Sequence, residues 1–177
     1  MSTRKPYMQT EWFPQAGMFP CLSISQPFAT AIAQGKKTIE LRKWGTRYRG
    51  LIAIHAGLSW YGGVKFDGKT KNDSYAIDAI KRAAIRMGTP ANVSEYPTGA
   101  IIATARLVAC KRLTEEEYEE LDNEHMSDAA WDSREYAWMF DRVEPLALPV
   151  VTRGYLGLFS VDAITIERAR NEEEVQQ

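Results

Sequence analysis

Two periodicities alternate along the first third of the chain. Residues 21–25 alternate apolar and polar side chains, which predicts a short strand. Residues 27–34 then carry apolar side chains at helical spacing, with a proline in the first turn and Gly35 after the last one, which predicts a short helix. The period returns to two over residues 38–42, and residues 51–57 are apolar enough for a central strand. The pattern therefore predicts strand, helix, strand and strand in quick succession.

The remainder of the chain adds helices and further strands. Residues 57–75 are rich in glycine, asparagine and aspartate and are expected to form a long loop. Thr114 and Glu117 have the spacing of a capping box, so a helix is expected to begin after Thr114. The other predicted elements are a helix over 74–88 and strands over 99–113, 136–141, 143–150 and 156–162. Six or seven strands and two or three helices in mixed order favour an α+β fold, a small, partly closed β-barrel flanked by helices.

The composition is that of one folded domain. The chain has 177 residues, of which 45% are hydrophobic and 25% charged. We expect an N-terminal arm over 1–17, a domain over 18–165 and a charged tail over 166–177 that frays. No run of about 18 apolar residues is present, and no apolar segment follows the first cations. We therefore expect neither a membrane span nor a secretion signal, and a cytoplasmic location.

The sequence implies no metal or redox cofactor. Its two cysteines, Cys21 and Cys110, are far apart, and two histidines beside them do not make a zinc site. Each cysteine lies in an apolar run, so both are expected to be buried, reduced thiols.

The charges are segregated along the chain, although the net charge is only −1. Residues 36–49 contain six cations and one anion, whereas residues 115–124 contain seven acids and no base. A basic cluster attracts phosphate through Coulomb energy and counterion release. The alternative is that both runs are solvated surfaces, which is the usual role of charged runs.

Two details of the basic cluster favour a binding role. Thr38, Glu40 and Arg42 project from one face of one predicted strand, where they would line a pocket. Trp44 and Tyr48 interleave with the cations, a combination that lets a base stack while its phosphate is held. Packing in the core or a loop is the alternative for both aromatic residues.

Four motifs lie in order at 23–27, 35–42, 46–50 and 54–56, and Trp138 with 143–146 and 154–159 follows them. The four motifs resemble those of the ASCH domain family, a branch of the PUA-like superfamily, and the later stretches resemble the family's closing strands. The resemblance implies a PUA-like β-barrel with a cleft between barrel and helices, and an RNA or nucleoside-like ligand. The residues that it and the charge pattern nominate for the ligand are Gln26, Lys36, Lys37, Thr38, Glu40, Arg42, Trp44, Arg47, Tyr48 and Arg49.

The same family contains small amidohydrolases that deacylate 4-acetylcytidine. Lys37 resembles their catalytic lysine, but Glu40 stands where they have a nucleophilic threonine. A carboxylate does not replace a hydroxyl in acyl transfer. Their further glutamate has no secure counterpart among residues 115–124.

Three functional hypotheses follow. The first is an RNA-binding or modified-nucleotide-binding module. The second is a hydrolase acting on a nucleoside or RNA, in which Lys37 and Glu40 perform general acid–base chemistry. The third is a protein-interaction adaptor that uses the acidic helix and the aromatic N-terminal arm. His55, at the end of a strand, is interpreted as a satisfied core histidine.

Overall fold

The structure is a computed structural model that describes residues 17–60, 74–90 and 92–171. Its strands are β1 (Met18–Gln26), β2 (Ile39–Arg42), β3 (Gly50–Trp60), β4 (Ala100–Arg112), β5 (Tyr136–Val151) and β6 (Leu158–Asp162). Its helices are α1 (Phe28–Ala33), α2 (Ser74–Arg86), α3 (Glu115–Glu120), α4 (Asp122–His125) and α5 (Ala163–Asn171), with a short 3₁₀ turn, η2 (Val93–Glu95).

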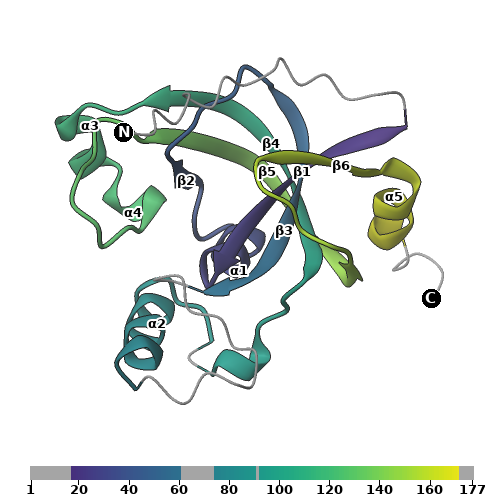
Figure 1. Ribbon diagram of the computed structural model, residues 1–177, viewed down its shortest axis with the longest axis horizontal. Coiled ribbons are helices and arrows are strands. Elements are labelled where there is room, and N and C mark those ends of the chain that lie inside the picture. Colours follow the sequence, from purple (N-terminus) through teal and green to yellow (C-terminus); the bar gives the residue numbers. More distant parts are fainter. Residues whose placement is uncertain (1–16, 61–73, 91, 172–177) are drawn as a thin grey trace, which may run out of the picture.

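One curled sheet carries the fold (Figure 1). The strand order is β2-β5-β4-β3-β1-β6, and every neighbouring pair is antiparallel except β1 and β3. The predicted α+β class is confirmed. The sheet curls as a barrel does but does not close, because β2 and β6 remain as its two edges. Helices α3 and α4 lie at one end of the molecule and α5 at the other (Figure 1).

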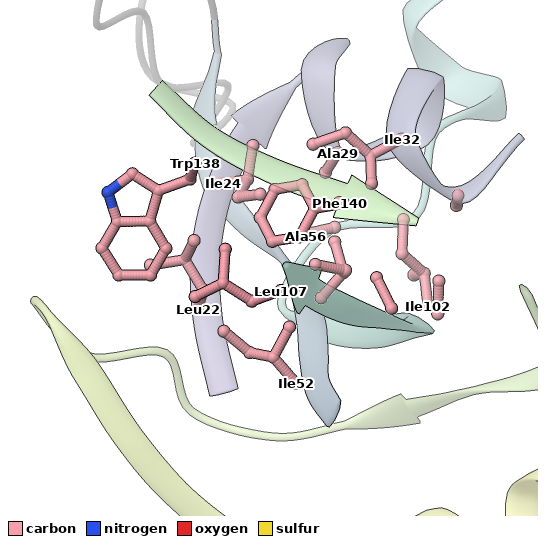
Figure 2. Packing of buried hydrophobic residues seen from close by; sticks show 14 residues of the cluster. Leu22, Ile24, Ala29, Ile32, Ile52, Ala56, Ile102, Leu107, Trp138 and Phe140 are labelled. Atoms are coloured by element: carbon pink, nitrogen blue, oxygen red, sulfur yellow. The ribbon is translucent and has the colours of Figure 1, made fainter. Parts of the chain in front are cut away.

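The main core lies on the inner face of the curled sheet, against α1. Leu22 and Ile24 of β1 point into it at the period expected of a half-buried strand. Phe140 of β5 lies in the middle of the cluster, and the fully buried Trp138 lies at one side of it (Figure 2). The other buried members are Ala29, Ile32, Ala33, Ile52, Ile54, Ala56, Ile102, Ala103, Ala105 and Leu107.

Side-chain hydrogen bonds start two of the helices. The Gln26 side chain accepts from the backbone N–H of Thr30 at 3.0 Å and donates to the carbonyl of Pro97 at 2.8 Å. Because both ends of its amide are used, this fully buried side chain fastens the start of α1 to the segment before β4. The expected capping box at Thr114 and Glu117 is confirmed, with both reciprocal bonds present.

The structure corrects three expectations. The two strands predicted over 136–141 and 143–150 form the single long strand β5, in which Arg142 takes a positive φ of 46° beside a register shift. The loop expected from residue 57 begins later, because β3 runs to Trp60. Residues 166–177 are expected from the sequence to fray, but residues 166–171 belong to α5. This helix buries Ile166 and Ala169 against the outer face of the sheet. An alternating sequence signal cannot show that a bulge lets one strand continue.

Some expectations concern residues that the structure does not describe. The arm over 1–16 and most of the loop, 61–73, lie outside them. Within the described part of the chain, no helix has the length and apolar character needed to cross a membrane. Both cysteines are free thiols as expected, although Cys110 is only partly buried.

Candidate ligand pocket

A pocket of about 400 Å³ opens between the edge strand β2, the start of α1 and the segment that follows α4. Its lining residues are Ser25, Phe28, Lys37, Glu40, Leu41, Arg42, Ser59, Trp60, His125, Ser127, Ala129 and Glu135. Pockets of a few hundred Å³ with mixed apolar and polar walls are typical small-molecule sites.

Lys37 is the most unusual residue of the pocket, because its side chain is only 2% exposed. Its ammonium donates to the carbonyl of Ile39 at 2.5 Å and to the carbonyl of His125. Glu40 lies 3.6 Å away, and the ring of Phe28 lies 5.1 Å away on another side. Burial lowers the pKa of Lys37 below its ordinary value, and the Glu40 carboxylate opposes that shift. Two carbonyl oxygens accept hydrogen bonds from this ammonium, and the Glu40 carboxylate forms an ion pair with it, so three oxygens fix its position.

Glu40 and Arg42 continue a row of charged side chains from the buried Lys37 toward solvent. They lie two residues apart on β2 and therefore face the same way, as the sequence predicts. Glu40 Oε1 lies 3.6 Å from a guanidinium nitrogen of Arg42, while Oε2 faces Lys37. The Arg42 guanidinium also lies over the ring of Trp44, 5.6 Å from its centroid. The result is a row of cation, carboxylate and cation along one pocket wall.

His125 and the residues after it form the wall next to Lys37. The buried His125 ring stacks on Tyr118, donates from Nε2 to the Tyr118 carbonyl at 2.8 Å and accepts at Nδ1 from the N–H of Ser127. This pattern requires the neutral imidazole, and burial lowers the pKa of His125 accordingly. Arg86 of α2 bonds Asp122, Asp128 and the Ser127 carbonyl, and so fastens this wall from outside.

The pocket lining is close to charge balance. Lys37 and Arg42 contribute two cations, while Glu40 and Glu135 contribute two carboxyl groups. Burial raises the pKa of Glu135 above its ordinary value, with Lys43 opposing. The strongly basic cleft suggested by the sequence is therefore not what lines this pocket.

Three of the residues that the sequence nominated for the ligand, Gln26, Lys36 and Thr38, do not line the pocket. Gln26 is fully buried and hydrogen-bonded, as described above. Lys36 points the other way and donates to the carbonyl of Gly88 after α2. Thr38 joins elements through its backbone, donating to the Glu124 carbonyl and accepting from the N–H of Phe140.

The nominated residues at 44–49 lie together elsewhere, across the open end of the curled sheet. Trp44 packs edge-on against Trp138 with ring centroids 4.6 Å apart, and the Tyr48 hydroxyl donates to the Leu51 carbonyl at 2.7 Å. Arg49 donates to the carbonyls of Thr46 and Tyr48, and Arg47 is exposed. The packing alternative for the two aromatic rings is thus realised.

Sequence reasoning missed several lining residues. Phe28 and Trp60 supply the apolar walls, Ser59 and Ser127 supply hydroxyl groups, and Glu135 supplies a second carboxyl group. None of them lies in the basic stretch 36–49, so only the folded chain brings them beside Lys37. The acidic residues of α3 are exposed apart from contacts such as the ion pair of Glu117 with Lys111, and their role as a protein contact stays a prediction.

His55 is a satisfied core residue, as expected. Its Nε2 donates to the Thr152 carbonyl at 3.1 Å, and its Nδ1 accepts from the Ser23 hydroxyl at 3.0 Å. Gly154 packs so closely here that a Cβ would lie 2.5 Å from the His55 ring. The histidine therefore fastens the loop between β5 and β6 to β1 and β3.

A comparison of the sequence with models of protein families identifies the family to which the chain belongs. A family model for the ASCH domain matches residues 22–152, about three quarters of the chain. The chain therefore belongs to the ASCH domain family, as its motifs predict. A comparison with curated protein sequences finds no match.

Solved structures support the same fold. An ASCH protein from Zymomonas mobilis matches with a TM-score of 0.51 and 15% identity over 84% of this chain and 91% of that one. A serine-to-alanine variant of that protein gives a TM-score of 0.50 and 16% identity over 88% and 96% of the two chains. A tyrosine-to-phenylalanine variant gives 0.51 and 15% over 84% and 94%. At this identity the likeness establishes the fold alone.

Proposed function

We propose that this protein is an RNA-binding module whose pocket holds one base, or one modified nucleoside, of the RNA. The observation that carries the proposal is the row of Lys37, Glu40 and Arg42, in which Lys37 and Glu40 are buried and which opens on a pocket of about 400 Å³. Ion pairs held largely out of solvent contribute little to net stability compared with apolar packing. A binding role explains why this chain keeps one.

The charge balance of the pocket favours a base over a phosphate group. A carboxylate such as Glu40 accepts hydrogen bonds from the amino and imino N–H groups of a base, and Arg42 donates to its carbonyl oxygens and ring nitrogens. The rings of Phe28 and Trp60 offer apolar surface beside these polar groups. A phosphate in the same place would meet two carboxyl groups, which oppose it electrostatically.

Glu40→Gln tests the proposal with little change in shape. Binding of unmodified and modified nucleosides, 4-acetylcytidine among them, and of short single-stranded RNA is measured by calorimetry. We expect the substitution to weaken binding about tenfold or more, because a buried amide cannot reproduce both charge-assisted contacts. Glu167→Gln, at an exposed position of α5, is the matched control. Equal binding by wild type and Glu40→Gln would mean that the pocket does not recognise the ligand.

A hydrolase is the second candidate, favoured by one specific observation. Lys37, with its lowered pKa, lies 3.6 Å from Glu40 on the wall of a pocket that also presents the hydroxyl groups of Ser59 and Ser127. In this reading Glu40 takes a proton from a water molecule that attacks an acyl carbon. The C–N bond breaks and the amine leaves with the proton. Lys37 acts by holding the carboxylate, because two of its N–H groups already donate to the carbonyls of Ile39 and His125.

Product analysis separates the two candidates. Purified protein is incubated with 4-acetylcytidine, other modified nucleosides and single-stranded RNA, and products are followed by mass spectrometry. Turnover that disappears in Glu40→Gln supports the hydrolase. A full panel without product, combined with binding that depends on Glu40, supports the binding module.

A further inference from the structure

A second group of cations lies beside the pocket, on the same face of the sheet. Arg42 of β2 is opposite Tyr136 of β5, and Tyr136 is opposite Arg112 of β4. Directly opposed residues of antiparallel strands point to the same face. The two arginines are therefore two strand spacings apart, about 10 Å between backbones, with an aromatic ring between them.

Both guanidinium groups are supported by aromatic rings. The Arg42 guanidinium lies over Trp44, and that of Arg112 lies 5.0 Å from the ring centroid of Tyr136. The rings themselves are held in place. Trp138 donates from its indole to the Trp44 carbonyl at 3.0 Å. Gly45 packs on Tyr136 so tightly that a Cβ would lie 2.5 Å from it. A guanidinium stacked on a fixed ring keeps its N–H edge available for an anion.

Arg49 adds a third positive charge at this end of the sheet. Its guanidinium reaches the Cys110 carbonyl at 3.3 Å, two residues before Arg112 on β4. Within residues 17–60, 74–90 and 92–171, neither Arg49 nor Arg112 forms an ion pair with a carboxylate. Their charges are thus available to a ligand, unlike that of Arg42, which Glu40 partly neutralises.

The acidic helix lies against the opposite face. Residues on either side of Arg112 point away from it, so Lys111 and Leu113 face α3. Lys111 pairs there with Glu117, and Leu113 packs with Tyr118. The sheet therefore separates the acidic residues of α3 from the arginine face. The segregation of charge along the sequence becomes a segregation between two faces.

We propose that Arg112 and Arg49, continuing from Arg42, form a track that binds the phosphates of an RNA strand whose base occupies the pocket. The physiological ligand is then a single-stranded polynucleotide rather than a free nucleoside. This inference rests on the proposed function, because Arg42 joins the track to the pocket. Fixed arginines spaced along a polar face suit a flexible chain of phosphates.

The test compares Arg112→Gln and Arg49→Gln with wild type across a salt titration. The probes are a fluorescein-labelled single-stranded RNA of mixed sequence and the free nucleosides from the panel above. We expect each substitution to reduce the salt slope of RNA binding by about 0.7 and to weaken binding about fivefold at low salt. Nucleoside binding should not change. Arg168→Gln, at an exposed position on α5 at the other end of the molecule, is the matched control (Figure 1).

The outcomes separate the track from the pocket. If Arg112→Gln and Arg49→Gln bind RNA as Arg168→Gln does, while Glu40→Gln loses binding, the track is wrong and the pocket stands. If the arginine variants lose RNA binding and Glu40→Gln keeps it, the track stands and the pocket assignment fails. Competition by poly-glutamate as strong as that by unlabelled RNA of equal charge would overturn RNA as the occupant in favour of an acidic protein.

Discussion

The basic stretch 36–49 divides into two regions that treat charge in opposite ways. Its first half contributes Lys37, Glu40 and Arg42 to the pocket, where Lys37 is buried and Glu40 lies between the two cations. Its second half crosses the open end of the sheet, where Arg49 is exposed and bonds only backbone carbonyls. Similar residues therefore have different energetics. The stability of a buried charge depends strongly on each partner, whereas the partners of an exposed arginine contribute little.

The largest expected effect is in the pocket half. Lys37→Met leaves the Glu40 carboxylate with Arg42 alone and leaves the carbonyls of Ile39 and His125 without this donor. Removing one partner of a buried pair costs about 3 to 5 kcal/mol. We expect the free energy of unfolding, measured by urea titration, to fall by that order.

A double substitution shows whether charge is the cause. In Lys37→Met combined with Glu40→Leu, both partners become apolar, and replacing a whole buried pair is often neutral. We expect the double variant to regain the part of the stability loss that comes from the unpaired Glu40 carboxylate, while the carbonyls of Ile39 and His125 still lack this donor. A double variant as unstable as the single one would mean that these hydrogen bonds and the packing of Lys37, rather than its charge, account for the loss.

A smaller effect is expected where α2 holds the pocket wall. Arg86→Met removes the contacts with Asp122, Asp128 and the Ser127 carbonyl. Because the Arg86 side chain is about one third exposed, we expect a loss of only about 1 to 2 kcal/mol in unfolding free energy. Nucleoside affinity should fall as well, since the wall carries Ser127. Lys81→Met, on an exposed position of α2, should change neither the melting temperature nor the affinity.

Acid should destabilise the region around the pocket by protonating His125, which lines the pocket. The pKa of His125 is lowered in the folded state, so its contribution to stability is complete above the unfolded value of about 6.5 and is lost as pH falls below it. Asp122 opposes the shift, while Lys37 and Arg86 add to it. Each histidine changes stability by at most about 1.4 kcal/mol per pH unit.

The histidine assignment is tested by urea titrations at several pH values. The pKa of His55 is lowered too, so wild type should lose stability through both groups. His125→Asn should lose stability less steeply below pH 6.5 than wild type. An unchanged pH dependence would place the effect on His55 alone.

The sequence predicted the parts of this comparison that depend on local periodicity. The alternation over 38–42 placed Glu40 and Arg42 on one face, and the spacing of Thr114 and Glu117 marked the start of α3. Family motifs located Lys37 in the pocket. These signals depend on residues that are close together in the sequence, so they can be interpreted without knowledge of the tertiary fold.

What the sequence did not predict depends on long-range placement. A run of cations does not show where the chain turns, so the charge pattern alone grouped Arg49 with Lys37 as ligand contacts. The walls provided by Trp60, Ser127 and Glu135 come together only because β3, the segment after α4 and the start of β5 converge on β2. Likewise, the pairing of Tyr136 with both Arg42 and Arg112 depends on strand register between distant segments.

The smallest expected effect on stability is at the open end of the sheet. Arg49→Met removes hydrogen bonds to the carbonyls of Thr46, Tyr48 and Cys110, all near the surface, so we expect a loss below about 1 kcal/mol. The melting temperature, measured by circular dichroism beside Lys37→Met, checks this difference. A loss as large as that of Lys37→Met would mean that Arg49 is needed to hold the loop over Trp138, and the contrast between the two regions would fail. A small loss in stability with a clear loss in RNA affinity would show that the second half of the basic stretch serves binding rather than folding.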